Sequence, residues 1–411
     1  MSDIRLPLRM LYLVGEPDGA ERVDVADLFA IRLAGLGLEI DYVLFENEST
    51  GLWRAKEWRG ARAFVVGRSK REGLIGRISN KLIEMSADLR TFWQALVGPY
   101  DVIQVRDKFV VGALGLAAAR LSGKRFVYWL SYPYAESRIL DGKEGRAAYP
   151  WLSIIGGRMA AWLLYRIIMP NADHVFVQSE QMLDDIAAEG VSRDLMTAVP
   201  MGVNESMLAV APAEVEPNSI LYLGTLNRVR RLDTLVEALA IVRQTNPNAR
   251  LIIVGDGPTP EDRGYLQQVV HRCSLSDAVQ FTGALSMGEA HTYVARAAVC
   301  VSPFYPTPIL QSTSPTKIVE YMALGRPVVA NSHPEQSLII AASSAGLCVE
   351  WSAAEFARAI SQLLDDPVRA EAMAARGRDY VRAHRTYAVI APLVAQEYAR
   401  LVPHADSRLS E

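Results

Sequence analysis

The sequence of 411 residues lacks most of the short motifs that define an enzyme class at once. It has no G-x-G-x-x-G after the first predicted strand, no G-x-x-x-x-G-K-[ST], no H-E-x-x-H and no G-x-S-x-G. These absences weigh against a dehydrogenase, an NTPase, a zinc hydrolase and a serine hydrolase. No two aspartates are separated by a single residue, so an Asp-x-Asp clamp for a metal and a sugar-nucleotide diphosphate is missing. Only three cysteines occur, without a Cys-x-x-Cys pair, which excludes a disulfide framework and indicates a reducing compartment.

The chain also lacks a strong excess of either charge, because it has 43 basic and 46 acidic residues. This balance argues against non-specific nucleic-acid binding. Basic residues nevertheless gather between Trp53 and Lys81, where nine basic residues are opposed by two acidic ones and interleaved with apolar side chains. Two interpretations have equal weight: attachment to an anionic membrane face, or a solvated helix face followed by a mobile loop.

Long hydrophobic runs without charge are scarce. The chain begins with Met-Ser-Asp-Ile-Arg and passes directly into a strand pattern, so we expect no cleaved leader. The most apolar segment, Ala147–Met169, contains Arg158 and Arg166. An arginine near a bilayer centre costs about 2.5–3.5 kcal/mol. We therefore predict a buried or surface-lying helix here and not a membrane span.

Short apolar runs alternate with helical patterns along the whole chain. Runs that are apolar throughout are typical of strands buried on both faces, and the alternation predicts doubly wound parallel sheets. Two sheets of about six strands fit better than one of twelve. The predicted strands are Met10–Val14, Asp41–Phe45, Ala63–Val66, Asp101–Val105, Arg125–Leu130 and His174–Gln178, then Ile220–Leu223, Arg250–Val254, Val279–Thr282, Val299–Val301, Pro327–Ala330 and Leu347–Glu350. A hinge is predicted at Glu205–Asn218, which divides residues 1–205 from residues 206–385.

A candidate ligand site follows the predicted strand Val299–Val301. Ser314 is a suitable N-cap, Pro315 suits the first helical position, and Gly325 is a suitable helix stop. A helix start at the carboxyl edge of a parallel sheet, with the Thr316 hydroxyl and the Lys317 ammonium, suits a phosphate. A carboxylate one turn further along the helix, that of Glu320, suits the vicinal hydroxyls of a sugar.

Residues 314–330 resemble the signature of the GT-B retaining glycosyltransferases, family 4 in particular. Further segments support the resemblance by their order and spacing: Ala172–Glu180, Val199–Asn204, Tyr222–Leu226 with Arg230 and Asp233, Ile253–Pro258, and Val279–Gly283. The resemblance implies two Rossmann-like domains facing across a cleft. Residues 1–205 would bind the acceptor, residues 206–385 the donor, and a C-terminal helix within residues 386–411 would cross back to the first domain.

The resemblance also implies a reaction and its partners. The donor would be a UDP-sugar or a GDP-sugar, and the acceptor a lipid-linked or cell-surface glycan. No metal and no permanently bound cofactor would be needed, because basic residues would neutralise the departing diphosphate. The protein would be cytoplasmic and peripheral at the inner face of the cell membrane.

Site residues follow from the same resemblance. Arg230 matches the lysine that the family places after the Gly-x-Leu turn, and Glu320 matches the second glutamate of the family's E-x7-E motif, which binds ribose hydroxyls. With Lys317 they form the candidate catalytic set. Gly15, in the turn Gly15–Gly19, matches the loop that faces the diphosphate and the acceptor. The remaining candidates for donor binding are Gly224, Thr225, Arg228, Arg231, Gly255, Phe281, Ser312, Ser314 and Thr316.

Three positions depart from the family pattern. Ser312 stands where the first glutamate of E-x7-E is expected, Thr225 where an arginine is usual, and Ser131 where a histidine is often found. Two alternatives therefore stay open: a sugar-nucleotide epimerase of the same fold, and a non-catalytic glycosyltransferase-like subunit. His333 and Glu335 could reach the sugar, but an equally good interpretation is that they cap a helix.

Overall fold

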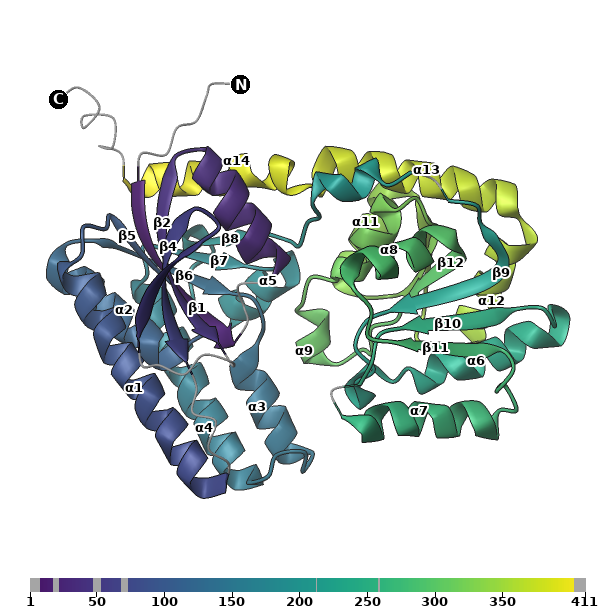
Figure 1. Ribbon diagram of the computed structural model, residues 1–411, viewed down its shortest axis with the longest axis horizontal. Coiled ribbons are helices and arrows are strands. Elements are labelled where there is room, and N and C mark those ends of the chain that lie inside the picture. Colours follow the sequence, from purple (N-terminus) through teal and green to yellow (C-terminus); the bar gives the residue numbers. More distant parts are fainter. Residues whose placement is uncertain are drawn as a thin grey trace. The chain divides into compact units, whose positions relative to one another are not determined.

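The computed structural model describes residues 8–17, 22–46, 53–67, 73–211, 213–257 and 259–402. The chain divides into two compact units (Figure 1). Unit 1 consists of residues 1–200 with 387–411, and unit 2 of residues 201–386. The chain passes between the units at 200/201 and again at 386/387. The segment Glu205–Asn218, which we predicted as a hinge, lies inside unit 2, where Glu205–Ala209 forms a short 3-10 helix, η6.

Unit 1 is built on an eight-stranded sheet in the order β3-β4-β2-β1-β5-β6-β7-β8. All pairs are parallel except β3 with β4, which are antiparallel. The strand bounds are β1 Leu8–Pro17, β2 Leu38–Glu46, β3 Arg54–Trp58, β4 Ala61–Gly67, β5 Val102–Arg106, β6 Arg125–Leu130, β7 His174–Val177 and β8 Met196–Ala198. The parallel strands are buried on both faces, as their apolar runs predict.

Helices cover both faces of this sheet. The larger layer consists of α1 Gly73–Val97, α2 Phe109–Ser122, α3 Tyr134–Lys143, α4 Pro150–Trp162, η3 Leu163–Ile168, η4 Met169–Asn171 and α5 Glu180–Ala188. Opposite them lie the π-helix η2 Asp24–Leu33 and the C-terminal helix α14 Tyr387–Leu401. Helix α14 packs on η2, and its Tyr398 hydroxyl donates to the buried Gln104 side chain of β5. The last described helix is therefore part of unit 1.

The predicted basic stretch forms neither a helix face nor an open loop over its described first half. Instead β3 and β4 form a hairpin in which basic side chains pair with acids on β2. Lys56 bonds Glu46, and Arg62 bonds Asp41. Trp53 stacks on Phe64 with ring centroids 5.1 Å apart. Residues 68–72 lie outside the described residues.

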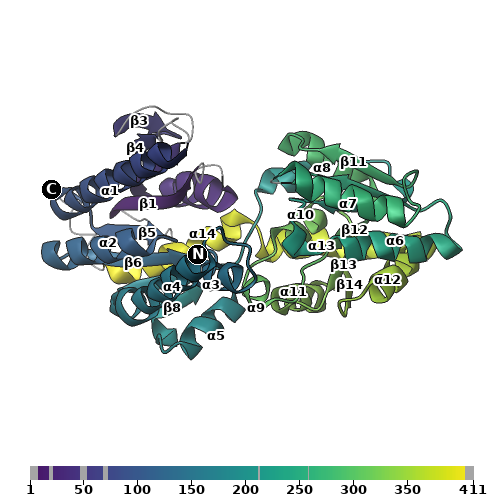
Figure 2. The ribbon, with the colours of Figure 1, turned by 90° about the horizontal axis from the view of Figure 1, so that it is seen from below.

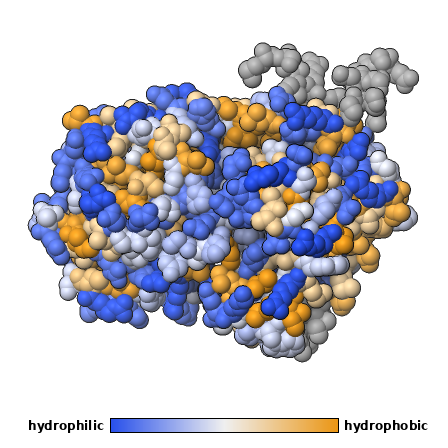
Figure 3. Space-filling view, turned by 180° about the vertical axis from the view of Figure 1, so that it is seen from behind, coloured by the Kyte–Doolittle hydropathy of each residue, from blue (hydrophilic) through white to orange (hydrophobic). Residues whose placement is uncertain are grey.

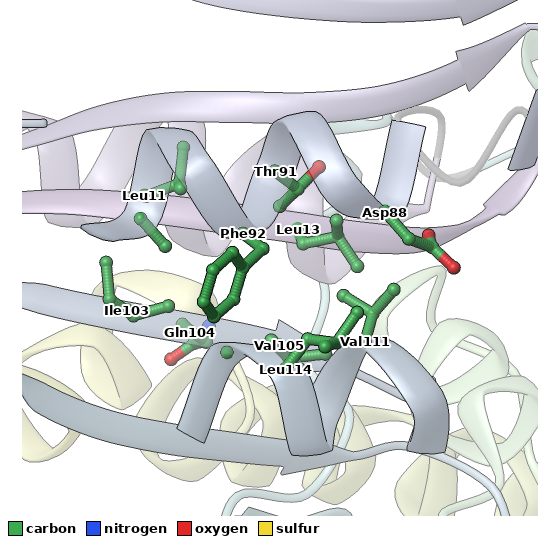
Figure 4. Close-up of a pocket in the computed structure, with 12 residues that line it drawn as sticks. Leu11, Leu13, Asp88, Thr91, Phe92, Ile103, Gln104, Val105, Val111 and Leu114 are labelled. Atoms are coloured by element: carbon green, nitrogen blue, oxygen red, sulfur yellow. The ribbon is translucent and has the colours of Figure 1, made fainter. Parts of the chain in front are cut away.

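The contact between α1, α2 and the sheet leaves a cavity of about 10 Å³, enough for about one water molecule (Figure 4). Leu13, Phe92 and Val111 line it together with Gln104, whose buried Nε2 has no hydrogen-bond partner among the described residues. The cavity is too small for a substrate, so it belongs to the packing of unit 1.

Unit 2 has a fully parallel six-stranded sheet in the order β11-β10-β9-β12-β13-β14 (Figure 2). The strands are β9 Glu216–Leu223, β10 Arg250–Val254, β11 Val279–Gly283, β12 Ala297–Ser302, β13 Val328–Asn331 and β14 Gly346–Val349. Helices α6 Asp233–Thr245, α7 Pro260–Arg272 and α12 Ala353–Asp365 pack on one core cluster. Helices α8 Met287–Arg296, α10 Thr316–Ala323 and α11 Pro334–Ser343 pack on the other, and α13 Pro367–His384 contacts both.

Candidate functional site

Glycines end three neighbouring strands at the carboxyl edge of the unit 2 sheet. Gly224, Gly255 and Gly283 follow or end β9, β10 and β11 with φ of +145°, +127° and +74°. The Gly224 N–H donates to Val254 O at 2.8 Å, and the Gly255 N–H donates to Gly283 O at 3.0 Å. A Cβ on Gly255 would lie 2.3 Å from the Gly224 carbonyl oxygen. The turns are therefore packed too closely for a side chain at this point, which leaves backbone open at the edge where ligands bind in such sheets.

Helix α10 starts at the same edge but one residue later than predicted. It begins at Thr316 with Pro315 in the N-cap position, so the prediction of Ser314 as N-cap and Pro315 as first helical residue was wrong. The Ser314 hydroxyl is used elsewhere: it accepts from the Met201 N–H at 2.9 Å and donates to Glu335 Oε1 at 3.0 Å. The helix ends at Ala323, and Gly325, the predicted helix stop, follows the C-cap Leu324 with φ of +71°. The first-turn N–H groups of α10 have no partner within the helix and can serve an anion.

Two cations meet above aromatic rings at this helix start. Lys317 Nζ lies 5.7 Å from the Tyr222 ring centre and 5.5 Å from the Phe304 ring centre. Arg230 Cζ lies 5.9 Å from the same Phe304 ring. A Cβ on Gly224 would fall 2.5 Å from Lys317 Cε, so the lysine stem passes directly over that glycine. Among the described residues, neither Lys317 nor Arg230 forms an ion pair.

The electrostatics of this pair favour an anionic ligand. Burial, and then the charge of Arg230, lower the pKa of Lys317 to about 7, against the opposing effect of Glu320. Burial raises the pKa of Glu320, which lies one turn further along α10, and Lys317 counteracts this. The charges of Lys317 and Arg230 repel each other, and Glu320 offsets this only in part. A bound diphosphate would supply the missing negative charge.

The other predicted arginines are engaged by neighbouring helices. Arg231 pairs with Asp233 at 3.2 Å and lies over Tyr305. Arg228 lies over Tyr265, with its ring centre 5.0 Å from Cζ, and its Nε is 3.9 Å from Asp262. Both side chains are exposed. They stand at the site's edge with their charge already partly neutralised.

The remaining predicted donor residues lie on the same edge in different settings. Thr225 is exposed at the β9 turn, and its carbonyl oxygen accepts from the Tyr222 hydroxyl at 3.2 Å. Phe281 lies in β11, with Arg263 Cζ 5.8 Å from its ring centre. Ser312 is buried at the end of α9 Pro308–Gln311. The structure thus places Lys317 against Gly224 and places Lys317 and Arg230 over the same Phe304 ring. Thr225, Phe281 and Ser312 lie at the same edge of the sheet.

Sequence reasoning named Glu335 as a possible sugar contact or helix cap but missed its role in supporting this site, and it missed Asn331 and Phe304. The buried carboxylate of Glu335 accepts from Ser314 and, at 2.8 Å, from Arg385. Asn331 clamps the Phe304 backbone, because its Oδ1 accepts from the Phe304 N–H at 2.7 Å and its Nδ2 donates to Phe304 O at 2.8 Å. An aromatic residue two positions beyond the strand Ala297–Ser302 was the only signal for Phe304.

His333 is a capping residue in the structure. Its Nδ1 accepts from the Glu335 and Gln336 N–H groups at 3.2 and 3.5 Å, and its Nε2 donates to Leu310 O at 2.9 Å. Both ring nitrogens are therefore occupied by the fold. Of the two interpretations given for His333, the structure shows the helix cap, at the start of α11.

The carboxyl edge of the unit 1 sheet is described in part. Gly15 lies within β1, which runs to Pro17, and the rest of the predicted turn, residues 18–19, lies outside the described residues. Next to it, the buried Arg106 donates to Asp24 at 2.7 Å and to Asp107 at 3.2 Å. Asp107 accepts from the Ser131 N–H at 2.7 Å and takes φ of +58°. Burial raises the pKa of Asp107, and Arg106 opposes this.

Comparison with known proteins assigns both units. Residues 24–202 match the family described as "Glycosyl transferase 4-like domain", and residues 217–366 match "Glycosyl transferases group 1". A GDP-mannose-dependent alpha-(1-6)-phosphatidylinositol monomannoside mannosyltransferase of Mycobacterium tuberculosis is 32% identical over 44% of this chain and 47% of its own length. A D-inositol 3-phosphate glycosyltransferase of Pseudarthrobacter chlorophenolicus is 26% identical over 66% of this chain and 64% of its own. The chain thus aligns with about half the length of the first of these relatives.

Solved structures agree on the fold. Sucrose-phosphate synthase from Thermosynechococcus elongatus superposes with a TM-score of 0.72 at 21% identity, over 96% of this chain and 99% of the other. Anabaena HepE in complex with UDP and glucose superposes with a TM-score of 0.68 at 18% identity, over 95% and 98%. Two parallel-sheet α/β units with these neighbours define the GT-B class of glycosyltransferases. Within that class, the chain carries a glycosyl transferase 4-like domain in unit 1 and a group 1 glycosyl transferase domain in unit 2.

Proposed function

We propose that this protein transfers a sugar from a UDP-sugar or GDP-sugar to a hydroxyl group of a lipid-linked or cell-surface glycan, with retention of anomeric configuration and without a metal. Unit 2 binds the donor, and unit 1 binds the acceptor. The names of two similar proteins support the donor class, because one is GDP-mannose-dependent and the other was solved with UDP.

One observation carries the proposal: Lys317 and Arg230 share the Phe304 ring at the start of α10, and neither has an ion-pair partner among the described residues. This arrangement fits a ligand group that carries two negative charges when bound and gains further negative charge when it departs as a leaving group. A nucleoside diphosphate is such a group. Charge stabilisation of this kind acts most strongly where water is excluded, and it is the largest contribution to catalysis in many enzymes.

The chemistry then needs few protein groups. The bond between the anomeric carbon and the β-phosphate oxygen breaks, and a bond from that carbon to the acceptor oxygen forms on the same face of the sugar. The acceptor proton passes to the departing phosphate oxygen. Lys317, Arg230 and the first N–H groups of α10 hold the diphosphate, and positioning supplies the remaining rate enhancement. Glu320 accepts hydrogen bonds from the ribose hydroxyls.

A transfer assay tests the reaction and separates it from the two alternatives. The purified protein is incubated with UDP-glucose or GDP-mannose and membrane lipid extract, with and without EDTA, and products are followed by NMR of the anomeric proton. Transfer with retention that EDTA leaves unchanged supports the proposal. Inversion at a carbon of the free nucleotide sugar would instead identify an epimerase. Binding of nucleotide without either reaction would identify a non-catalytic subunit.

The role of Glu320 has its own test. Glu320→Gln removes a charge-assisted hydrogen bond to ribose, which is worth about 1.5–3 kcal/mol, or about 10- to 150-fold in donor affinity. Glu289→Gln is a matched control, because Glu289 lies in the first turn of α8 in the same unit and caps that helix through Ser286. Unchanged donor affinity and turnover in Glu320→Gln would remove Glu320 from the site.

A further inference from the structure

Helix 150–171, formed by α4, η3 and η4, carries its apolar side chains on the outside of unit 1. Trp151, Ile155, Met159 and Trp162 are 63%, 49%, 67% and 59% exposed. Their spacing of four, four and three residues places all four on one helix face. Among the described residues this is also the one helix long and apolar enough to span a membrane, and only 33% of its most apolar window is buried. Figure 3 shows apolar side chains in orange reaching the surface among polar ones in blue.

The opposite face of helix 150–171 is fixed to the fold. Gly157 and Ala160 are buried there. A Cβ on Gly157 would lie 2.6 Å from Ile139 Cγ1 and 2.8 Å from Ala135 O, both in α3. Close packing of this kind holds the helix against α3 along one side. The outer apolar face is therefore held in place by the fold and is exposed for contact with an apolar surface.

The charges of this segment have one sign. Residues 145–171 contain Arg146, Arg158 and Arg166 and no aspartate or glutamate. Arg158 is exposed and lies one residue before Met159 on the outer side of α4. Arg166 is also exposed, and it donates to the Glu189 carbonyl oxygen at 2.5 Å. No acidic partner of Arg158 occurs among the described residues. A helix that lies in the head-group region of a bilayer combines an apolar face that carries tryptophan with basic side chains that reach the lipid phosphates.

Helix α1 adds a second apolar stripe to the same layer. Leu82, Met85, Leu89 and Trp93, at spacings of three, four and four residues, are each more than half exposed. Helices α1, α2 and η3 contact one another in this order over one face of the sheet. The apolar surface of this layer is therefore broader than a single helix.

We propose that the outer face of helix 150–171, together with the α1 stripe on the other side of α2, rests on a bilayer that contains anionic lipids. Helix 150–171 lies in the plane of the head groups: its tryptophans and Met159 enter the acyl boundary, and Arg158 and Arg166 contact lipid phosphates. This differs from the stretch 53–81 predicted from sequence, because Lys56 and Arg62 in that stretch are already paired with acids and Trp53 packs on Phe64. The inference concerns unit 1 and does not rest on the transfer reaction.

Vesicle sedimentation with full-length protein tests this surface. The wild type should bind vesicles of phosphatidylglycerol and phosphatidylcholine, bind phosphatidylcholine alone more weakly, and be released by a carbonate wash. Leu152→Glu/Met159→Glu should lower the binding at least tenfold, and Arg158→Gln about fivefold on the anionic vesicles. Met287→Glu/Leu338→Glu repeats the same two changes at exposed positions of unit 2 (58% and 59%) and should bind like the wild type.

Three results would overturn the proposal. Equal vesicle binding by Leu152→Glu/Met159→Glu and the wild type would show that another surface makes the contact. Retention after carbonate would identify a spanning helix. Absence of vesicle binding, with a wild-type dimer in light scattering that Leu152→Glu/Met159→Glu dissolves, would show that a second copy covers the face. Circular dichroism and thermal unfolding check that each variant is folded. Vesicle binding by a chain that transfers no sugar would leave this inference standing while removing the proposed function.

Discussion

At the residue scale, the site depends on Lys317, whose positive charge is disfavoured by burial and by the neighbouring Arg230. Motif matching could predict Lys317, Arg230 and Glu320, because they lie at fixed distances from recognisable turns. It could not predict Tyr222, Phe304 or Glu335, whose role arises from packing between segments far apart in the chain. Burial of Lys317 and the charge of the neighbouring Arg230 explain why its pKa falls toward neutrality.

This pKa makes donor binding depend on pH. A nucleotide sugar has no group that titrates near neutrality, so the free Lys317, with a pKa of about 7, must take up a proton when the diphosphate binds above that pH. Affinity for UDP-glucose or GDP-mannose should fall as pH rises, by up to about tenfold per unit above pH 7. Lys317→Arg keeps its charge at every pH and should abolish the slope. Calorimetry in buffers of different ionisation enthalpy measures the proton uptake, and a pH-independent affinity without uptake would contradict the account.

Gly224 gives a second test at the same scale. Gly224→Ala places a methyl group 2.5 Å from Lys317 Cε and forces alanine into φ of +145°. The strain should cost about 1–3 kcal/mol of unfolding free energy, and the displaced lysine should weaken UDP binding. Gly264→Ala, in α7 with nothing within 4 Å of the new Cβ, is the control and should be neutral or stabilising. Urea unfolding and UDP titration of both variants measure the two effects. Equal stability and equal UDP affinity of Gly224→Ala and Gly264→Ala would refute the close approach of Lys317 to Gly224.

At the element scale, continuous apolar runs were sufficient to predict twelve of the fourteen described strands in their order along the chain. They missed β3, whose residues Arg54–Trp58 are mostly charged, and β8, which has only three residues. The capping pattern Ser314-Pro315, in turn, set the start of α10 one residue early. A serine before a helix predicts a cap, but the Ser314 hydroxyl instead hydrogen-bonds with Met201 and Glu335. No local sequence pattern can reveal these two partners, because both are far from Ser314 along the chain or beyond the helix start.

The same network predicts a stability effect. Ser314→Ala leaves the buried Met201 N–H and one bond of Glu335 without their partner. The loss should cost about 1–3 kcal/mol of unfolding free energy and weaken UDP binding, because the start of α10 is less firmly held. Ser332→Ala removes an exposed hydrogen bond to Glu350 and should cost less than about 1 kcal/mol. Chemical unfolding compares the two, and an equally small cost at Ser314 would show that the network does not hold the helix.

At the scale of the whole molecule, the two units have different roles in the proposal, and nucleotide should reveal this. Hydrogen exchange with saturating UDP or GDP should slow at residues 224–231 and 316–320 of unit 2. A nucleotide at a hundred times its Kd stabilises the state that binds it by about 2.7 kcal/mol. Protection confined to unit 1 would reverse the assignment of donor and acceptor units.

The most direct test of the central claim is a calorimetric titration of UDP and GDP into four proteins: wild type, Arg230→Ala, Lys317→Ala and Arg382→Ala. Arg382 is an exposed arginine of unit 2 that pairs with Asp379 at 2.7 Å and serves as control. The account predicts that Arg230→Ala and Lys317→Ala each lose about 10- to 150-fold in affinity for at least one nucleotide, while Arg382→Ala binds like the wild type. Wild-type affinity in both Arg230→Ala and Lys317→Ala would show that the paired cations at the start of α10 do not hold the diphosphate.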